Sequence, residues 1–222
     1  MLSFADYGEL IRKLARMAER KGGVPAPATD NEVSQEDWDG QDLSGQMHAN
    51  VAFVDVDMTE VTNNGGVFSE CSFRDVQFNA STHTSAAFLN CTFTRCSFFS
   101  ATFTGCKFVG SRFDHCTYTT LKVTGGDWSF VGMPGADLRG VEITDVRMRE
   151  ADLTGIRGEG ATISNVDLSG AWLHNANLSE SDLRGSDLST LDLNATDLTR
   201  ARIGWEQAVQ LVTVLGLDVL PD

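Results

Sequence analysis

The sequence predicts an all-β solenoid, in which the chain winds as one continuous coil around an apolar interior. From Trp38 to Ile203, positions whose numbers end in 3 or 8 are almost all large and apolar, and this frame never slips. Positions ending in 1 or 6 are mostly small, chiefly Ala, Val, Cys and Ser, and the other three positions of each repeat are mostly polar. A period of five fits neither an α-helix nor a flat strand. We therefore expect two inward residues and one corner in each repeat.

The large inward position changes character along the chain. It is mainly Phe in the N-terminal half and mainly Leu in the C-terminal half. Four residues break the apolar rule, namely His48, Asn63, His83 and Gly158. The sequence alone does not explain these four exceptions.

Composition limits the possible functions. The chain has 222 residues, enough for one sizeable domain, and a formal net charge of -14, which argues against nucleic-acid binding and suits a basic partner. No window is long and apolar enough for a membrane span, and no secretory signal is evident, so we expect a cytoplasmic protein. The five Cys residues show neither CxxC nor Cys/His spacing, so we expect no metal and no cofactor.

An enzymatic function is not expected. No HExxH, P-loop or GxSxG motif occurs, and the glycines are dispersed at corners instead of forming a phosphate loop. A convex rod offers no pocket that would shift pKa values or exclude water.

The five-residue frame ends after Ile203, and the remaining segment, 204–222, is expected to form a capping helix and a tail. Apolar residues from Trp205 to Leu215 have helical spacing, and Gly216 is a plausible C-cap. The helix has more apolar surface than one cap requires, which favours an isologous dimer. The expected dimer interface consists of Trp205, Ala208, Val209, Leu211, Val212 and Leu215.

The N-terminal segment also lies outside the repeat. Residues 1–21 predict an amphipathic helix with a basic second face, and 22–35, which contain Pro25 and Pro27, predict a linker. We favour a helix that folds over the first coil, and docking on a membrane surface is the alternative.

The tandem pattern, well represented by Ala136-Asp137-Leu138-Arg139-Gly140, resembles the pentapeptide-repeat family over residues 36–203. The resemblance implies a right-handed quadrilateral β-helix with four repeats, or twenty residues, per coil. Residues twenty apart then stack, for example Phe53 on Phe73. Cys71 would stack on Cys91 and Cys96 on Cys116, where a disulfide is sterically possible but free buried thiols are expected.

Within that family the chain resembles the gyrase-protecting MfpA/Qnr branch, and the loopless MfpA type most. The segments that carry this resemblance include 68–71, 85–93 and the non-repeat end at 201–203, 207–209 and 216–217. The resemblance implies a homodimer, joined by the C-terminal helices, whose acidic rods mimic duplex DNA. It also implies that the protein binds DNA gyrase and protects it from quinolones or other poisons. The first 35 residues depart from the short family members.

One side of the expected coil, the side over Trp38, Met58 and Phe78, is richest in carboxylates. The residues predicted to contact the partner there are Asp57, Glu60, Asp137, Glu159, Glu180 and Asp197. Two other interpretations stay open: the charges can serve solubility alone, or the rod can be a scaffold for a different protein partner. Arg139, Arg157 and Arg200 lie on the same side and could pair locally with the acids. Phe99 and Trp172 also point outward in this frame.

Overall fold

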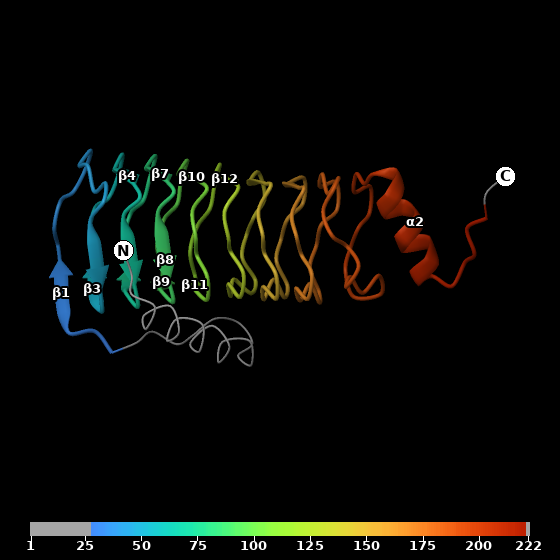
Figure 1. Cartoon of the computed structure of the whole chain (residues 1–222), viewed down its shortest axis with the longest axis horizontal. Helices are drawn as coiled ribbons and strands as arrows, with labels where there is room; N and C mark the ends of the chain where they lie inside the picture. Colours follow the sequence, from blue (N-terminus) through green and yellow to red (C-terminus); the bar gives the residue numbers. More distant parts are fainter. Residues whose placement is uncertain (1–27, 221–222) are drawn as a thin grey trace, which may run out of the picture.

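Residues twenty positions apart lie side by side on neighbouring coils of a rod (Figure 1). The computed structural model describes residues 28–220. Phe53 is in register with Phe73, Phe73 with Phe93, and Phe93 with Phe113, all in parallel pairing. The predicted twenty-residue coil and the all-β solenoid are therefore confirmed.

The strands are short, and each forms one flat segment of a coil. They are β1 Asn31–Ser34, β2 Met47–Ala49, β3 Val51–Val54, β4 Thr62–Asn64, β5 Val67–Ser69, β6 Ser72–Arg74, β7 Thr82–Thr84, β8 Ala87–Leu89, β9 Thr92–Thr94, β10 Thr102–Thr104, β11 Arg112–Asp114, β12 Lys122–Thr124, β13 Glu142–Thr144 and β14 Thr162–Ser164. They form three parallel sheets, ordered β1-β3-β6-β9-β11, β14-β13-β12-β10-β7-β4 and β2-β5-β8. Each sheet is one side of the rod.

The fourth side consists of isolated bridges between successive coils. Residues 37, 57, 77, 97 and 117 form one ladder of parallel bridges, and residues 137, 157, 177 and 197 form another. Side chains on this side are therefore spaced by one coil, about 4.8 Å. This is the side on which the acidic residues were predicted.

The β-helix begins earlier than predicted. Strand β1 lies within the segment 22–35 that was predicted to be a linker, and it pairs with β3 in the register Asn31↔Val51. Val33, at a position ending in 3, packs against the core, so the repeat frame already holds there. The predicted helix at 1–21 and residues 22–27 of the linker lie outside the described residues.

The interior is a set of stacked aromatic columns that gives way to Leu and Ile. The rings of Phe53 and Phe73 are 4.9 Å apart and nearly parallel, and Phe73 and Phe93 are 4.8 Å apart. In a second column Trp128 follows Phe108, with ring centroids 4.2 Å apart. Both predicted columns are thus present, and their buried rings supply most of the apolar surface of the N-terminal half.

The small inward positions carry hydrogen-bond donors as well as apolar groups. Cys91 Sγ donates to the carbonyl oxygen of Phe68 at 3.4 Å, and Ser111 Oγ donates to that of Phe88 at 2.9 Å. The same contact, to the residue 23 positions earlier, recurs at Ser186. Cys and Ser therefore satisfy inward-turned carbonyl groups of the preceding coil. All five Cys residues are free.

Corners occur at positions ending in 0 or 5, where the backbone is left-handed. Glycine occupies many of these corners, but Asn50, Glu60 and other residues also adopt φ near +55° there. Gly126 is different because it lies one residue after a corner and has a φ of +98°. A Cβ at Gly126 would lie 2.0 Å from the carbonyl oxygen of Cys106, so only glycine fits.

Helix α2 (Trp205–Val214) closes the C-terminal end of the rod (Figure 1). Gly216 adopts φ +80° and its N–H donates to the Thr213 carbonyl, while the Leu217 N–H donates to that of Val212. This is a Schellman C-cap, which confirms the predicted end of the helix. Within residues 28–220, no helix is long and apolar enough to cross a membrane.

Candidate partner-binding surface

The acidic face is defined here as residues 36–40 and every corresponding segment twenty residues later, up to 196–200. All six predicted partner-binding residues lie on it, and the bridge ladders hold Asp57, Asp137 and Asp197 at equivalent places on their coils. The structure therefore brings the six onto one face. Their local environments, however, differ along the rod.

Four of the six make no ion pair with another described residue, namely Asp57, Glu60, Glu159 and Asp197. Asp57 and Asp197 each accept a hydrogen bond from the backbone N–H two residues on, at 2.9 Å from Thr59 and Thr199. The backbone hydrogen bond from Thr199 lowers the pKa of Asp197 and keeps it ionised. Glu60 is exposed at a left-handed corner. No described cation pairs with Asp57, Glu60 or Asp197.

Asp137 is neutralised by two arginines. The Arg139 guanidinium donates through Nε and Nη2 to the two carboxylate oxygens at 2.8 and 2.6 Å. Nη2 of Arg157, one coil further on, lies 3.0 Å from Asp137 Oδ2. The hydrogen bond from Arg139 is the main cause of the lowered pKa of Asp137. Asp137 is therefore a weak source of negative potential.

The remaining two predicted residues are also engaged. Glu180 Oε1 lies 3.3 Å from Arg200 Nη1, and Glu159 Oε1 accepts a hydrogen bond from Asn177 Nδ2 at 2.8 Å. All three arginines of the acidic face thus lie in its C-terminal half. The N-terminal segments 36–40 and 56–60 contain carboxylates and no Lys or Arg. Negative potential on the acidic face is therefore concentrated over the first coils.

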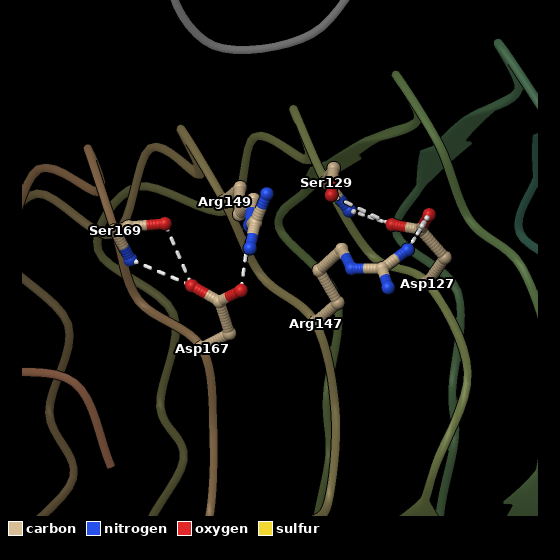
Figure 2. Close-up of polar contacts among 6 residues, drawn as sticks. All are labelled: Asp127, Ser129, Arg147, Arg149, Asp167 and Ser169. Atoms are coloured by element: carbon tan, nitrogen blue, oxygen red, sulfur yellow. Dashed lines mark hydrogen bonds and ion pairs between the residues drawn. The ribbon is translucent and has the colours of Figure 1, made fainter.

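Cross-coil ion pairs also occur on the opposite face of the rod, which carries residues 126–130, 146–150 and 166–170 (Figure 2). Arg147 Nη1 lies 3.1 Å from Asp127 Oδ2, and Arg149 Nε lies 2.5 Å from Asp167 Oδ2. Burial raises the pKa of Asp167, but hydrogen bonds from Ser169 and Arg149 outweigh it, and the net shift is downward. Charges on this face are largely compensated.

Of the two aromatic residues predicted to point outward, Phe99 is 52% exposed on the acidic face, and Trp172 is half-buried. Phe99 lies between the carboxylate-rich N-terminal coils and the arginine-paired C-terminal ones. Only Phe99 is thus a large apolar contact on this face.

The predicted dimer residues surround α2. Trp205 and Leu215 are 80% and 64% exposed, whereas Leu211 packs against the core of the rod. Ala208, Val209 and Val212 are half-buried. Beyond the helix, Leu217, Val219 and Leu220 add further exposed apolar surface. The end of the rod is therefore apolar, and Leu211 belongs to the joint between helix and coil.

Gln207 is a structural residue that hydrophobic spacing did not reveal. It is buried in the joint, and its Nε2 donates to the carbonyl groups of Leu183 and Ser186 at 2.7 and 2.8 Å. Its Oε1 accepts from the N–H groups of Gly204 and Gly185. One amide thus links α2 to the last coil through three hydrogen bonds and caps the start of the helix through a fourth.

Residues 28–220 contain no cluster of three metal-ligating side chains. The fold and the acidic face define a class of protein: an all-β solenoid rod built on a five-residue repeat, with a charged side and a capping helix. The comparisons with known proteins agree with that class. The family model for pentapeptide repeats (8 copies) matches residues 160–201, and the model for the SV2A/B/C luminal domain matches residues 31–118.

Among solved structures, the chain is similar to trypsin-treated QnrB1, a plasmid-mediated fluoroquinolone resistance protein. Identity is 21% and the TM-score 0.53, over 84% of this chain and 99% of that one. HetL, a pentapeptide repeat protein of Nostoc sp. strain PCC 7120 involved in heterocyst differentiation regulation, is 14% identical with a TM-score of 0.29, over 88% and 93% of the two chains. No curated protein matches the chain. The likeness to QnrB1 shows a shared fold.

Proposed function

We propose that this protein binds DNA gyrase through its acidic face, in place of duplex DNA, and so modulates the enzyme and protects it from quinolones or other gyrase poisons. The observation that carries the proposal is a set of carboxylates on one side of a rod, gathered at segments 36–40 and 56–60 and present again from residue 137 onward. Asp37 and Asp57 are in register on neighbouring coils. Their spacing of about 4.8 Å is comparable to the rise of about 3.4 Å between phosphates along one DNA strand.

The shared fold with QnrB1 also supports the proposal. QnrB1 confers resistance to a fluoroquinolone and shares this fold. The resemblance of the non-repeat end, which includes Gln207 and Gly216, to the gyrase-protecting branch adds to it. A binding role is also the natural use of a convex rod with charge on one side.

The uneven pairing of charges supports a contact at the N-terminal coils. Because Asp137 and Glu180 are paired with arginines, Asp57 and Glu60 contribute more to the field that a basic protein surface meets. We infer that the N-terminal coils of the acidic face make the strongest electrostatic contact with gyrase.

A supercoiling assay with gyrase, with and without a fluoroquinolone, tests this function. The double variant Asp57→Asn, Glu60→Gln should weaken inhibition or drug rescue roughly three- to tenfold, which corresponds to about 0.7–1.4 kcal/mol. Asp137→Asn should have a smaller effect because its charge is already compensated.

The chain offers a matched control on another face. Asp42 accepts a hydrogen bond from the Ser44 N–H as Asp57 does from Thr59, and Asp145 occupies a left-handed corner as Glu60 does. Asp42→Asn, Asp145→Asn therefore removes the same charge with the same local geometry. An equal loss in both double variants would show that only total charge matters. No effect of the unaltered protein on gyrase would favour a scaffold for a different partner.

We propose, second, that two copies join through α2 and the tail. The exposed side chains of Trp205, Leu215 and Leu220 at the end of the rod support this arrangement, since apolar surface of this kind is typical of a self-association site. Two rods joined in this way would present a longer acidic surface.

A further inference from the structure

A groove interrupts the middle of the acidic face. It has a volume of about 410 Å³. Its lining residues are Cys116, Thr117, Tyr118, Thr119, Asp137, Arg139 and Arg157. This volume is in the range of sites that hold small molecules, about 300–1,000 Å³.

The groove reaches a cysteine. Cys116 is half-buried, whereas Cys71, Cys91, Cys96 and Cys106 are all buried. Ala136, in the same inward column, is also half-buried, while Cys96 and Ile156 on either side of this pair are 1% exposed. The inward column is thus partly exposed to solvent at Cys116 and Ala136.

The thiol of Cys116 has polar surroundings. Its Sγ lies 3.5 Å from the carbonyl oxygen of Phe93 and 3.6 Å from that of Asp114, and Cys96 occupies the equivalent place in the coil before. Interaction with the neighbouring Cys96 thiol is the main cause of a lowered pKa at Cys116, while burial raises the pKa of Cys96 well above its usual value. Of the two stacked cysteines, Cys116 is the less buried residue and has the lower thiol pKa.

Two guanidinium groups lie at the rim of the same groove. Arg139 holds Asp137 through Nε and Nη2, which leaves Nη1 without a described partner. Arg157 contacts Asp137 through Nη2, and its Nε and Nη1 are without a described partner. With Asp137 and with Glu159, which also lies near Arg139, the two arginines carry no net charge, so a carboxylate would be bound by the free N–H groups of the two guanidinium groups.

We propose that Cys116 is a site of reversible S-thiolation by a small disulfide that carries carboxylates, of which glutathione disulfide is the type, and that Arg139 and Arg157 bind its carboxylates. The Cys116 thiol loses its proton to solvent, and the thiolate attacks one sulfur of the disulfide. A new S–S bond forms to Cys116, the old S–S bond breaks, and one glutathione leaves as a thiolate. Cys116 sulfur is oxidised and the departing sulfur is reduced, so atoms and electrons balance.

The neighbouring thiol determines how the reaction can continue. Cys96 can attack the Cys116 sulfur and expel the second glutathione, because stacked coils place the two Cα atoms about 4.8 Å apart, within disulfide range. Burial keeps Cys96 protonated, so this second step is slow and the mixed disulfide accumulates. The inference does not depend on gyrase binding, although an adduct would lie on the acidic face.

The test uses the fully reduced chain and glutathione disulfide, followed by peptide mapping with mass spectrometry. We expect modification at Cys116 before any other cysteine, either as the glutathione adduct or as a Cys96–Cys116 disulfide. Cys116→Ala should abolish the early product, and Cys106→Ala should leave it unchanged. Early modification of a buried cysteine such as Cys91 would overturn the proposal.

A second pair of variants tests the role of the arginines. Arg139→Gln, Arg157→Gln should slow reaction with glutathione disulfide roughly fivefold relative to reaction with uncharged 2-hydroxyethyl disulfide. The ratio of the two rates cancels any general change in thiol exposure. Arg184→Gln is the matched control, because Arg184 holds Asp182 in the same two-residue bidentate geometry on another face. An unchanged ratio in the double variant, or an equal change in Arg184→Gln, would overturn the arginine assignment.

Discussion

His83 and Asn63 replace large apolar residues in the core, and one hydrogen-bonded chain accounts for both. Ser81 Oγ donates to the Phe78 carbonyl at 2.7 Å, so it accepts from His83 Nε2 at 3.0 Å. His83 Nδ1 is then free to accept from Asn63 Nδ2 at 3.3 Å, and Asn63 Oδ1 accepts the Gly66 N–H. His83 can donate to Ser81 and accept from Asn63 at the same time only while it is neutral.

The hydrogen bonds of His83 predict that the stability of the core is sensitive to acid. The groups that face His83 are Asn63, Ser81 and the rings of Phe78, Phe88 and Phe103, none of them charged, and burial lowers the pKa of His83 to about 3. The unfolded chain, with a His pKa near 6.5, therefore binds more protons between pH 6.5 and 3, and stability falls as pH falls through that window. From pH 7 to 5 the loss is about 2 kcal/mol from His83.

Urea unfolding of His83→Phe at pH 7 and pH 5 measures this contribution. The variant should lose about 2 kcal/mol less between the two pH values than the natural chain, whatever its absolute stability. His48 is half-buried and stacks on Phe68, so His48→Phe should reduce the pH dependence by a smaller amount. An unaltered pH dependence in His83→Phe would place the sensitive group elsewhere.

At the scale of the element, the coil tolerates most residues at its corners but not at the place where two backbones touch. Gly126 is such a place, because its missing Cβ leaves room for the carbonyl oxygen of Cys106. Gly135 occupies an ordinary corner with φ +69° and open space around it. The two glycines therefore have different physical roles.

We expect Gly126→Ala to cost at least about 3 kcal/mol, since backbone strain adds to a clash with a carbonyl that cannot move freely. Gly135→Ala should cost about 1–2 kcal/mol, the ordinary penalty for a left-handed residue with a side chain. Denaturant titration of both variants gives the comparison. Equal losses would mean that the coil at Gly126 can shift away.

The joint between α2 and the last coil depends on Gln207. Its amide satisfies two N–H groups and two carbonyl groups that would otherwise be left at the open end of a solenoid.

Gln207→Leu should therefore destabilise the chain by about 2–4 kcal/mol, and faster hydrogen exchange should appear at the Gly185 and Gly204 amides. Gln210 is exposed on the same helix, so Gln210→Leu is the control. It should change the free energy of unfolding by no more than about 0.5 kcal/mol. Unchanged hydrogen exchange at the Gly185 and Gly204 amides in Gln207→Leu would contradict the proposed role of Gln207 in the joint.

At the scale of the whole molecule, the rod has two chemically different parts. Carboxylates without cationic neighbours gather over the N-terminal coils, and apolar side chains gather at the C-terminal end. A dimer joined at the apolar ends would place the two carboxylate-rich regions at its far tips. The proposed gyrase contact and the proposed dimer contact thus use opposite ends of one chain.

The dimer is tested with a substitution that leaves the joint intact. Leu215→Glu introduces a charge at an exposed position, so it should yield monomers by light scattering while thermal stability of the coil is retained. Leu211→Glu is a poor substitute, because Leu211 packs against the core. A dimeric mass in Leu215→Glu would move the interface away from α2, and a monomeric natural chain would remove it.

The sequence by itself determined the five-residue repeat and the capping helix, because both depend on a local period and on which side chains are apolar. The stacking of residues twenty apart, and with it the side of the rod on which acids gather, followed from the resemblance to the pentapeptide-repeat family. The start of the coil was placed late because Val33 is one isolated apolar residue in an otherwise polar segment.

Only the tertiary structure decided which charges are free and which polar groups are satisfied. Asp57 and Asp137 look alike in the repeat, yet two arginines reach only Asp137, one of them from the next coil. The same holds for Gln207, whose partners are more than twenty residues away, and for the pairing of His83 with Asn63. Ion pairs and hydrogen bonds depend on distances between coils, and a period of five residues contains no information about side-chain direction at that scale.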